Sequence, residues 1–149
     1  MPAFAQWTMD HEVMDPVAMG RVFTLEEEYA WFDETSQAED DVQWTVLLNK
    51  DQRIIGSCGL HRIHDPAGPE FGILIGDKRE WGKRYAAEII DLIKRFVLEE
   101  LQMHRMHLKV FVANGKAVRA YERSGFLIIK KDVEPRYNNA ENYHMELNF

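Results

Sequence analysis

Three adjacent residues with phosphate-binding chemistry, Gly82, Lys83 and Arg84, stand where a loop meets a predicted helix. An apolar run, Phe71 to Ile75, comes before this loop and predicts a buried strand. Apolar residues then recur at helical spacing from Tyr85 to about Leu101. A helix N-terminus has unpaired N–H groups and positive potential, and glycine lets the backbone approach a ligand closely. Lysine and arginine add charged donors. The arrangement therefore predicts a phosphate site.

The loop lacks the two commonest phosphate-binding motifs. Neither GxxxxGK[ST], the loop of many nucleoside triphosphatases, nor GxGxxG, the dinucleotide fingerprint, occurs there. The phosphate ligand must therefore be recognised in another way.

Composition sets limits on fold and partners. The 149 residues are 46% hydrophobic and 29% charged, which predicts one globular domain spanning residues 1–149. A net charge of −7 without a long basic run argues against nucleic acid as a partner. No apolar run approaches the roughly 20 residues of a membrane span, and no signal-peptide pattern opens the chain. We therefore expect a cytoplasmic protein that does not enter membranes.

Other elements follow from periodicity and capping signals. Thr24 and Glu27 form a T-x-x-E capping box, which predicts a helix over Thr24–Asp33. Glycine and proline punctuation predicts a meander that ends with the Phe71–Ile75 strand. A long helix then crosses over to a parallel strand. The other expected elements are a short helix over Asp10–Met19, a helix from Asn114 as its N-cap to about Ser124, strands over Val42–Asn49, Ile54–Ile63, Met106–Val112, Phe126–Lys130 and Tyr143–Phe149, and a polar loop over Asp132–Asn139.

Two segments of the sequence resemble one known family. Arg79 to Arg84 (REWGKR) is similar to the [RQ]-x-x-G-x-[GA] motif of the GNAT superfamily of acyl-CoA N-acyltransferases, although Arg84 stands where Gly or Ala is usual. Downstream, the text from Asn114 to Phe126 (NGKAVRAYERSGF) matches the family's second conserved stretch. The branch that it resembles contains ribosomal-protein N-terminal acetyltransferases and polyamine acetyltransferases.

The resemblance implies an α/β fold with a mixed, mostly antiparallel sheet. One parallel pair of strands is splayed, and acyl-CoA lies in the gap between them. The family usually opens with a strand, which here is either missing or replaced by Met1 to Thr8. The resulting sheet edge would be exposed, and a second copy of the chain would cover it as a homodimer.

The resemblance also implies roles for individual residues. Glu70 becomes the candidate general base and Tyr121 the candidate general acid; the alternatives are a solvated turn residue and a packing residue. The coenzyme, acetyl-CoA as co-substrate, would contact the Phe71–Ile75 strand, the loop with the first helical turn, and the downstream segment. The implied contacts are Ile73, Leu74, Ile75, Gly82, Lys83, Arg84, Tyr85, Ala86, Asn114 and Lys116.

The function implied is N-acetylation of a primary amine by direct attack. The acceptor is a small amine, an amino sugar or a protein N-terminus. A non-catalytic acyl-CoA-binding module is the main alternative, and a fold relic that binds no coenzyme is the third. Cys58 is expected to be structural because no covalent intermediate is needed.

Four other residues have both a functional and a plainer structural interpretation. His61 and His64 have no third ligand at useful spacing, so no metal site is expected. His61 near the acceptor is the alternative to a strand-end histidine. Trp31 and Phe32 line the acceptor pocket or pack in the core.

Overall fold

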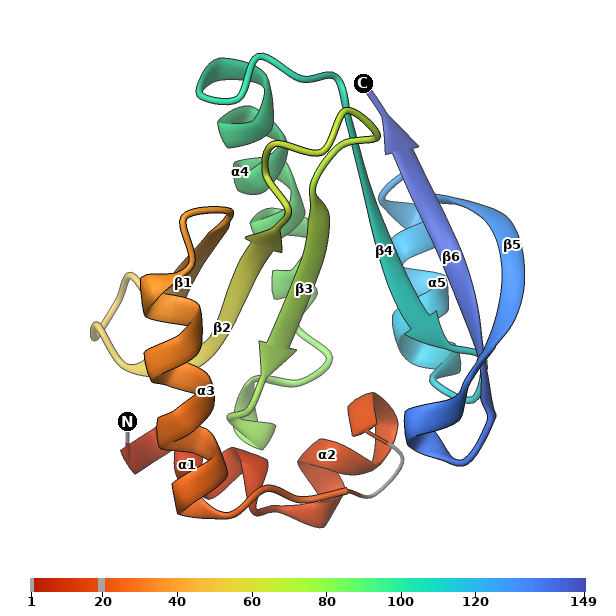
Figure 1. Cartoon of the computed structure of the whole chain (residues 1–149). Helices are drawn as coiled ribbons and strands as arrows, with labels where there is room; N and C mark the ends of the chain where they lie inside the picture. The colour runs from red at the N-terminus through yellow and green to blue at the C-terminus, as the bar shows by residue number, and fades with distance from the viewer. Residues whose placement is uncertain (1, 19–20) are drawn as a thin grey trace.

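The computed structural model describes residues 2–18 and 21–149 (Figure 1). A six-stranded sheet has the strand order β1-β2-β3-β4-β6-β5. Helices α4 and α5 lie behind the sheet in Figure 1, and α1, α2 and α3 lie in front of it and below. The strands are β1 (Asp41–Leu47), β2 (Ile54–His61), β3 (Glu70–Ile75), β4 (Arg105–Phe111), β5 (Leu127–Glu134) and β6 (Ala140–Asn148). The helices are α1 (Pro2–Thr8), α2 (His11–Ala18), α3 (Leu25–Gln37), α4 (Tyr85–Glu99) and α5 (Gly115–Arg123), with single 3₁₀ turns η1 (Lys78–Glu80) and η2 (Pro135–Tyr137).

The sheet consists of two antiparallel halves joined by one parallel contact. Strands β1, β2 and β3 pair antiparallel, as do β4, β6 and β5. Between the halves, the parallel register contains the single pair Glu70 and His107. The His107 N–H also donates to the Pro69 carbonyl at 3.0 Å. Beyond this point β3 and β4 diverge toward their C-terminal ends (Figure 1), which confirms the expected splayed pair.

The main core lies between the sheet and α4. One face of α4 buries Ile89, Ile90, Ile93 and Val97 against strand residues that include Leu60 and Leu108. The i, i+1, i+4, i+8 spacing of these residues is that of an amphipathic helix. Ile90 and Leu60 are completely buried, and burial of one such side chain stabilises a fold by about 1.5–3 kcal/mol relative to exposure. A smaller cluster packs Val13, Met14 and Ala18 of α2 on the opposite face, against Leu74.

The N-terminal segment is helical. The predicted short helix is confirmed as α2, while Met19 lies outside the described residues. Of the two alternatives for the start of the chain, a poor replacement strand over Met1 to Thr8 is wrong, because residues 2–8 form α1. The other alternative, a missing first strand, agrees with the described part of the chain. Within residues 2–18 and 21–40 no strand precedes β1, so β1 is an edge of the sheet. None of the described helices has the length and apolarity needed to cross a membrane.

Near the C-terminus, the predicted polar loop over Asp132–Asn139 is wrong in its first part. Strand β5 continues to Glu134, a 3₁₀ turn follows, and β6 begins at Ala140. A register shift between Ile128 and Lys130 interrupts the alternation of β5 with β6. β5 is an edge strand, and nearly all of its residues are exposed. Polar side chains are therefore compatible with a strand here, although they suggested a loop.

Candidate active site

The loop between β3 and α4 contains two left-handed backbone positions. Gly82 has φ 76° and Arg84 has φ 63° and ψ 25°. A Cβ added to Gly82 would have no atom within 4 Å, so the backbone angle rather than crowding favours glycine there. For a residue with a side chain, the left-handed region costs roughly 1–2 kcal/mol. The backbone at Arg84 thus has the conformation that suits the glycine usual in the motif.

Helix α4 begins without a side-chain cap. Arg84 occupies the N-cap position and makes no capping hydrogen bond from its side chain. At the start of α5, by contrast, the Asn114 side chain accepts a hydrogen bond from the Ala117 N–H at 3.4 Å. The first-turn N–H groups of α4, including those of Tyr85 and Ala86, therefore remain available to an anion, which the helix dipole also favours.

Ion pairs beneath the loop hold it to the rest of the sheet. Arg53, in the turn between β1 and β2, pairs with Asp77 and also with Glu80, at 2.5 Å from its Nη2. Lys83 Nζ lies 2.8 Å from the other carboxylate oxygen of buried Glu80. The hydrogen bond from Lys83 lowers the pKa of Glu80, and the same bond raises the pKa of Lys83. Lys83 is thus engaged within the protein, whereas no ion pair of Arg84 is found in the described part of the chain.

A cleft of about 290 Å³ lies where β3 and β4 separate. It brings together three predicted residues, Glu70 and Ile73 from β3 and Tyr121 from α5, and a fourth, Asn114, at the start of α5. Other lining groups come from the far half of the sheet and from α2: Pro16, Val17, Lys109, Val110, Phe111, Glu134, Arg136, Tyr137 and Asn142. Of the remaining predicted contacts, Lys116 is exposed in the first turn of α5 and is not part of this lining.

Tyr121 has the properties of a proton donor. Its ring packs edge-on against Phe126, with 5.8 Å between the ring centroids. Removal of water from the hydroxyl raises the pKa of Tyr121 to about 12. The hydroxyl therefore keeps its proton at neutral pH and has a proton to give to a leaving thiolate.

Glu70 begins β3 at the closed end of the splayed pair. Its carboxylate is half-buried and forms an ion pair with Arg62, from the connection that precedes the strand. The carboxylate lines the same cleft as Tyr121, which lies on α5. The structure thus places an acidic side chain and a proton donor along one cavity.

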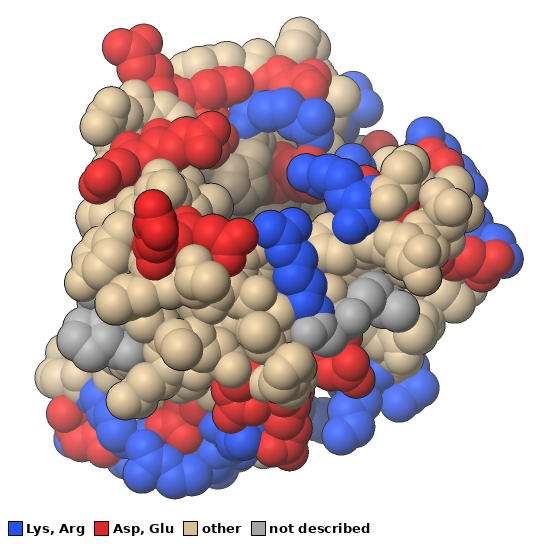
Figure 2. Space-filling model, turned by 60° about the horizontal axis from the view of Figure 1, so that its bottom comes forward, with Lys and Arg blue, Asp and Glu red and all other residues tan. Residues whose placement is uncertain are grey.

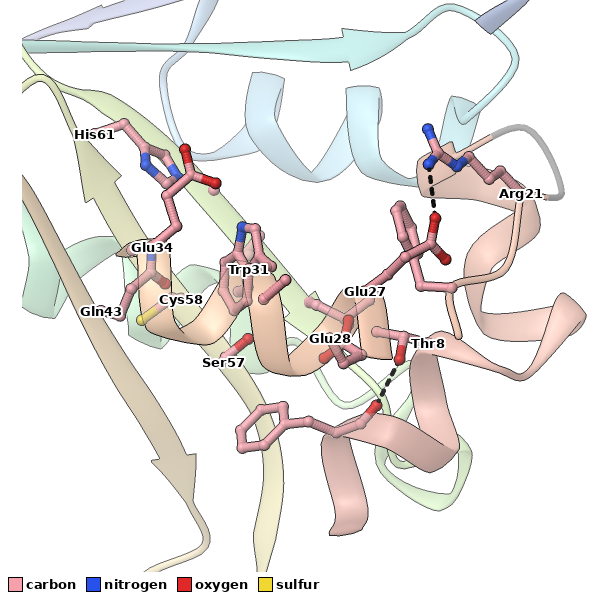
Figure 3. A pocket seen from close by; sticks show the side chains of 17 residues that line it. Thr8, Arg21, Glu27, Glu28, Trp31, Glu34, Gln43, Ser57, Cys58 and His61 are labelled. Carbon is pink, nitrogen blue, oxygen red and sulfur yellow. Dashed lines mark hydrogen bonds and ion pairs between the residues drawn. The ribbon is translucent and has the colours of Figure 1, made fainter. Parts of the chain in front are cut away.

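A second cavity, of about 480 Å³, separates α3 from β2 and β3. Figure 3 shows Glu27, Glu28, Trp31 and Glu34 projecting from α3 toward this space. Glu28 is buried, and its burial raises the pKa of the carboxyl group. Three carboxyl groups beside an indole ring suit a cationic ligand, because carboxylates attract cations and the indole face adds a cation–π contact.

The structure also shows the surroundings of the aromatic, histidine and cysteine residues for which the sequence left alternative roles. Trp31 and Phe32 are both 47% exposed and line cavities, so they are not core residues. The His61 side chain lines the second cavity, and its Nδ1 lies 2.9 Å from Asp41 Oδ2.

Cys58 is buried, and burial raises the pKa of its thiol to about 11, which disfavours the reactive thiolate. Among the described residues, no group of three His, Cys, Asp or Glu side chains is arranged to hold a metal ion.

Three functional candidates escaped sequence reasoning. Glu28 lies in a run of three glutamates, and only the helical period distinguishes its buried face from the exposed ones. Arg53 bonds Asp77 and Glu80, which lie 24 and 27 positions further along the chain, and no sequence pattern links residues at such a separation. Asn142 lies on the face of β6 that it shares with His144 and Glu146, so alternation along the strand groups it with polar residues and gives no sign that it faces a cleft.

The charges are unevenly distributed on the face that includes the cleft region. Figure 2 shows basic side chains around a hollow near the centre of this view, with acidic side chains at the upper left and others mixed with basic ones along the bottom. An anionic ligand and a cationic one would therefore each meet complementary charge on the same face.

Comparison with known proteins places this architecture in a family. A family model described as an acetyltransferase (GNAT) domain matches residues 1–127. The chain therefore belongs to the GNAT acetyltransferase family, which confirms the resemblance seen in the sequence.

Individual relatives share moderate similarity with this chain. Spermidine N(1)-acetyltransferase of Vibrio cholerae is 31% identical over 114 residues, which cover 70% of this chain and 64% of the relative. An uncharacterized protein of Methanocaldococcus jannaschii is 29% identical over 111 residues, 73% of this chain but 22% of that protein. The chain thus spans less than two thirds of the length of these curated relatives.

Solved structures confirm the fold. The complex of Vibrio cholerae spermidine N-acetyltransferase with CoA and spermine superposes with a TM-score of 0.81 at 21% identity, covering 97% of this chain and 87% of that one. A GNAT-family acetyltransferase from Bacillus anthracis gives 0.82 at 21% identity, covering 99% and 87%.

Proposed function

We propose that the protein is an acetyl-CoA-dependent N-acetyltransferase that acts on a primary amine by direct attack. The uncapped start of α4, with left-handed Gly82 and Arg84 in front of it, is the observation that carries this proposal. A pyrophosphate supplies the anion that such a terminus favours. The N–H groups of Gly82 to Ala86 would hold it, with Arg84 as the uncompensated cation.

The rest of the coenzyme would follow the gap between the two half-sheets. The strand edge of β3 over Ile73, Leu74 and Ile75 is open toward β4, because the parallel pairing ends at Glu70 and His107. Pantetheine amides would add to this edge as a partial strand. Asn114 would contact the pantetheine arm, and exposed Lys116 the adenosine phosphate. A solved structure with this fold is a complex with CoA and spermine, which supports this assignment.

The reaction needs two proton transfers and no covalent enzyme intermediate. The amine nitrogen attacks the thioester carbonyl, the C–N bond forms and the C–S bond breaks. Glu70 would accept the proton lost by the amine, directly or through water, and Tyr121 would donate a proton to the leaving thiolate. Burial raises the pKa of Tyr121 to about 12, so the hydroxyl is protonated at neutral pH, which a proton donor requires.

The acceptor that the geometry favours is a cationic amine. The carboxyl groups of Glu27, Glu28 and Glu34 border one cavity. The one Lys or Arg in its described lining, Arg21, is paired with Glu27 at 3.3 Å. The relative that acetylates spermidine supports the same class of acceptor. Amino sugars and protein N-termini are the other acceptors to be compared in a screen.

The first test is the melting temperature with acetyl-CoA, with ADP and buffer as controls. Binding to the folded state raises the melting temperature by mass action, so acetyl-CoA should give a clear rise and ADP little. No rise with acetyl-CoA would favour a relic without coenzyme. Binding without acetylation of any amine would favour the non-catalytic module.

The second test separates catalysis from binding. We expect Tyr121→Phe and Glu70→Gln each to lower kcat by roughly 10²–10⁴-fold, the usual worth of a positioned acid or base. The rise in melting temperature with acetyl-CoA should persist in both variants. Unchanged kcat in both would refute the assigned roles.

A further inference from the structure

Asn142 carries a polar group whose bonding capacity the folded chain leaves unused. The residue is 5% exposed, and its Oδ1 has no hydrogen-bond partner. In the described part of the chain it is the one buried side-chain oxygen or nitrogen in this state. A buried acceptor without a donor is destabilising, and the great majority of buried polar atoms in native proteins have a partner. A ligand that supplies the donor would account for a carboxamide at this position.

The position of Asn142 relates it to the reaction. Its side chain lines the cleft that also contains Glu70 and Tyr121. In the sheet register, Asn142 lies opposite Phe111 of β4. Glu70 lies beside His107, four residues before Phe111 on the same strand. Because His107 and Phe111 are four residues apart on one strand, they point to the same face of the sheet.

That face is the one away from α4 and α5. The alternate residues of β4, namely Met106, Leu108 and Val110, are buried in the core that contains α4. Asn142 therefore shares a face with Glu70, whereas Tyr121 approaches the cleft from α5 on the other face. An amine that gives its proton to Glu70 would arrive on the same side as Asn142.

The chemistry of the missing partner can be narrowed. A carboxamide oxygen accepts a hydrogen bond and requires an N–H or O–H donor. Lys109 and Arg136 also line the cleft, and neither of them bonds the Asn142 oxygen in the folded chain. The two ligand groups with N–H donors are the amides of the pantetheine arm and the amine nitrogen, which carries up to three as an ammonium group. The amine is favoured because Asn142 shares a face with Glu70, and a pantetheine donor would instead make the KM for acetyl-CoA rise when Asn142 is replaced.

We propose that Asn142 determines acceptor specificity: its carboxamide oxygen accepts a hydrogen bond from the amine nitrogen in the cleft. The inference rests on the proposed acetyltransferase function and adds a residue that neither sequence motif includes. The carboxamide also favours a ligand with an N–H donor over an ether or ester ligand of the same shape, because the ether or ester would leave the Asn142 oxygen without a hydrogen bond.

The test replaces Asn142 with Leu, which has a similar volume and no polar atom. Removal of an unpaired buried oxygen should keep or raise the melting temperature of the free protein. At the same time kcat/KM for the amine should fall about 10-fold, while the KM for acetyl-CoA stays the same. Asn148→Leu, an exposed site on the same strand outside the cleft, is the matched control and should change neither constant.

A second variant tests the sign of the interaction. Asn142→Asp offers a carboxylate to a cationic amine, so the amine should raise the melting temperature of this variant more than that of the wild type. The probes are spermidine, glucosamine and a short peptide with a free N-terminus, each added to protein saturated with CoA.

The outcomes separate this inference from the proposed function. A selective loss of kcat/KM in Asn142→Leu supports it, and wild-type kinetics in that variant overturn it. If the wild type acetylates none of the probes, the proposed function fails. The inference about Asn142 is then tested by the melting temperatures of the wild type and Asn142→Leu with each amine. An amine that raises the melting temperature of the wild type more than that of Asn142→Leu then supports the inference. No such amine among the probes overturns it.

Discussion

The N-termini of α3 and α4 are built in opposite ways. At α3, the Thr24 side chain accepts a hydrogen bond from the Glu27 N–H at 3.2 Å, and Glu27 accepts one from the Thr24 N–H at 2.8 Å. At α4, Arg84 provides no side-chain cap and has a left-handed backbone. The α3 terminus satisfies its own donors, whereas the α4 terminus leaves them for a ligand.

The difference shows how a binding terminus is distinguished from a structural one. Every helix has unpaired N–H groups in its first turn, so the dipole alone identifies no site. A reciprocal cap neutralises them at α3, and α5 also has a capping side chain in Asn114. Only at α4, among these three helices, does the chain combine missing capping with a glycine-bearing loop.

The sharpest way to break this contrast is to give α4 an anion of its own. Arg84→Asp replaces the cation with a carboxylate that competes for the same N–H groups and repels a pyrophosphate. We expect the affinity for acetyl-CoA to fall by about 100-fold, measured by isothermal titration calorimetry.

Arg95→Asp is the control for the change of charge, because Arg95 is exposed midway along the same helix. It should leave the affinity within about 3-fold, as expected for a distant exposed charge in physiological salt. Equal losses in the two variants would mean that net charge rather than the helix terminus binds the coenzyme.

A glycine at position 84 separates the effect of the arginine charge on binding from the effect of the left-handed backbone on stability. Arg84→Gly removes the cation but relieves the left-handed strain, so the free energy of unfolding should rise by roughly 0.5–1 kcal/mol. The affinity for acetyl-CoA should fall about 10-fold, less than for the aspartate variant, because the N–H groups stay free. Urea denaturation and calorimetry measure the two effects; a destabilised variant would contradict the strain argument.

The capped terminus should respond in stability alone. Thr24→Ala removes the cap of α3 and should lower the free energy of unfolding by about 1 kcal/mol. The affinity for acetyl-CoA should stay the same, because neither Thr24 nor Glu27 belongs to the β3–α4 loop or to the lining of the cleft between β3 and β4. A loss of coenzyme binding as large as that of Arg84→Gly would erase the distinction between the two termini.

The smallest expected effect is in the pH dependence of the α3 cap. The backbone hydrogen bond from Thr24 lowers the pKa of Glu27 below its ordinary value of 4.5. The stabilisation from this carboxylate is therefore fully present above about pH 4.5 and is lost as the pH falls through the lowered pKa. The melting temperature of the wild type should exceed that of Glu27→Gln at pH 6 and converge with it on acidification. A constant difference down to pH 3 would contradict this account.

Local signals predicted the elements around the site well. The capping box at Thr24, the cap at Asn114 and the start of α4 at Tyr85 all depend on residues within one helical turn. Their predictions are confirmed because neighbouring residues decide such features. The helical α1 was missed because Pro2 to Thr8 is a short stretch without a clear period.

The interior of the site was harder to predict. Arg53 pairs with the β3–α4 loop from a turn that is distant in sequence, and Asn142 faces the cleft only because β6 pairs with β4. Such contacts arise from tertiary packing, and no spacing within either segment specifies them. The sequence could therefore indicate the loop that we propose to bind the coenzyme, but not the groups that support this loop or those that we propose to face the amine.

The splayed strands make the middle of the sheet behave as an edge. At an ordinary edge strand, the unpaired N–H and C=O groups can pair with a strand of another chain, and charged side chains or bulges often prevent such pairing. Here the unpaired backbone of β3 opens inside the fold, where a flat partner sheet has no access. A slender, extended chain with regularly spaced amides fits such an edge, and pantetheine is one. Short extended peptidomimetics with the same amide spacing are consequently a rational class of competitive inhibitors, with a scaffold unrelated to nucleotides.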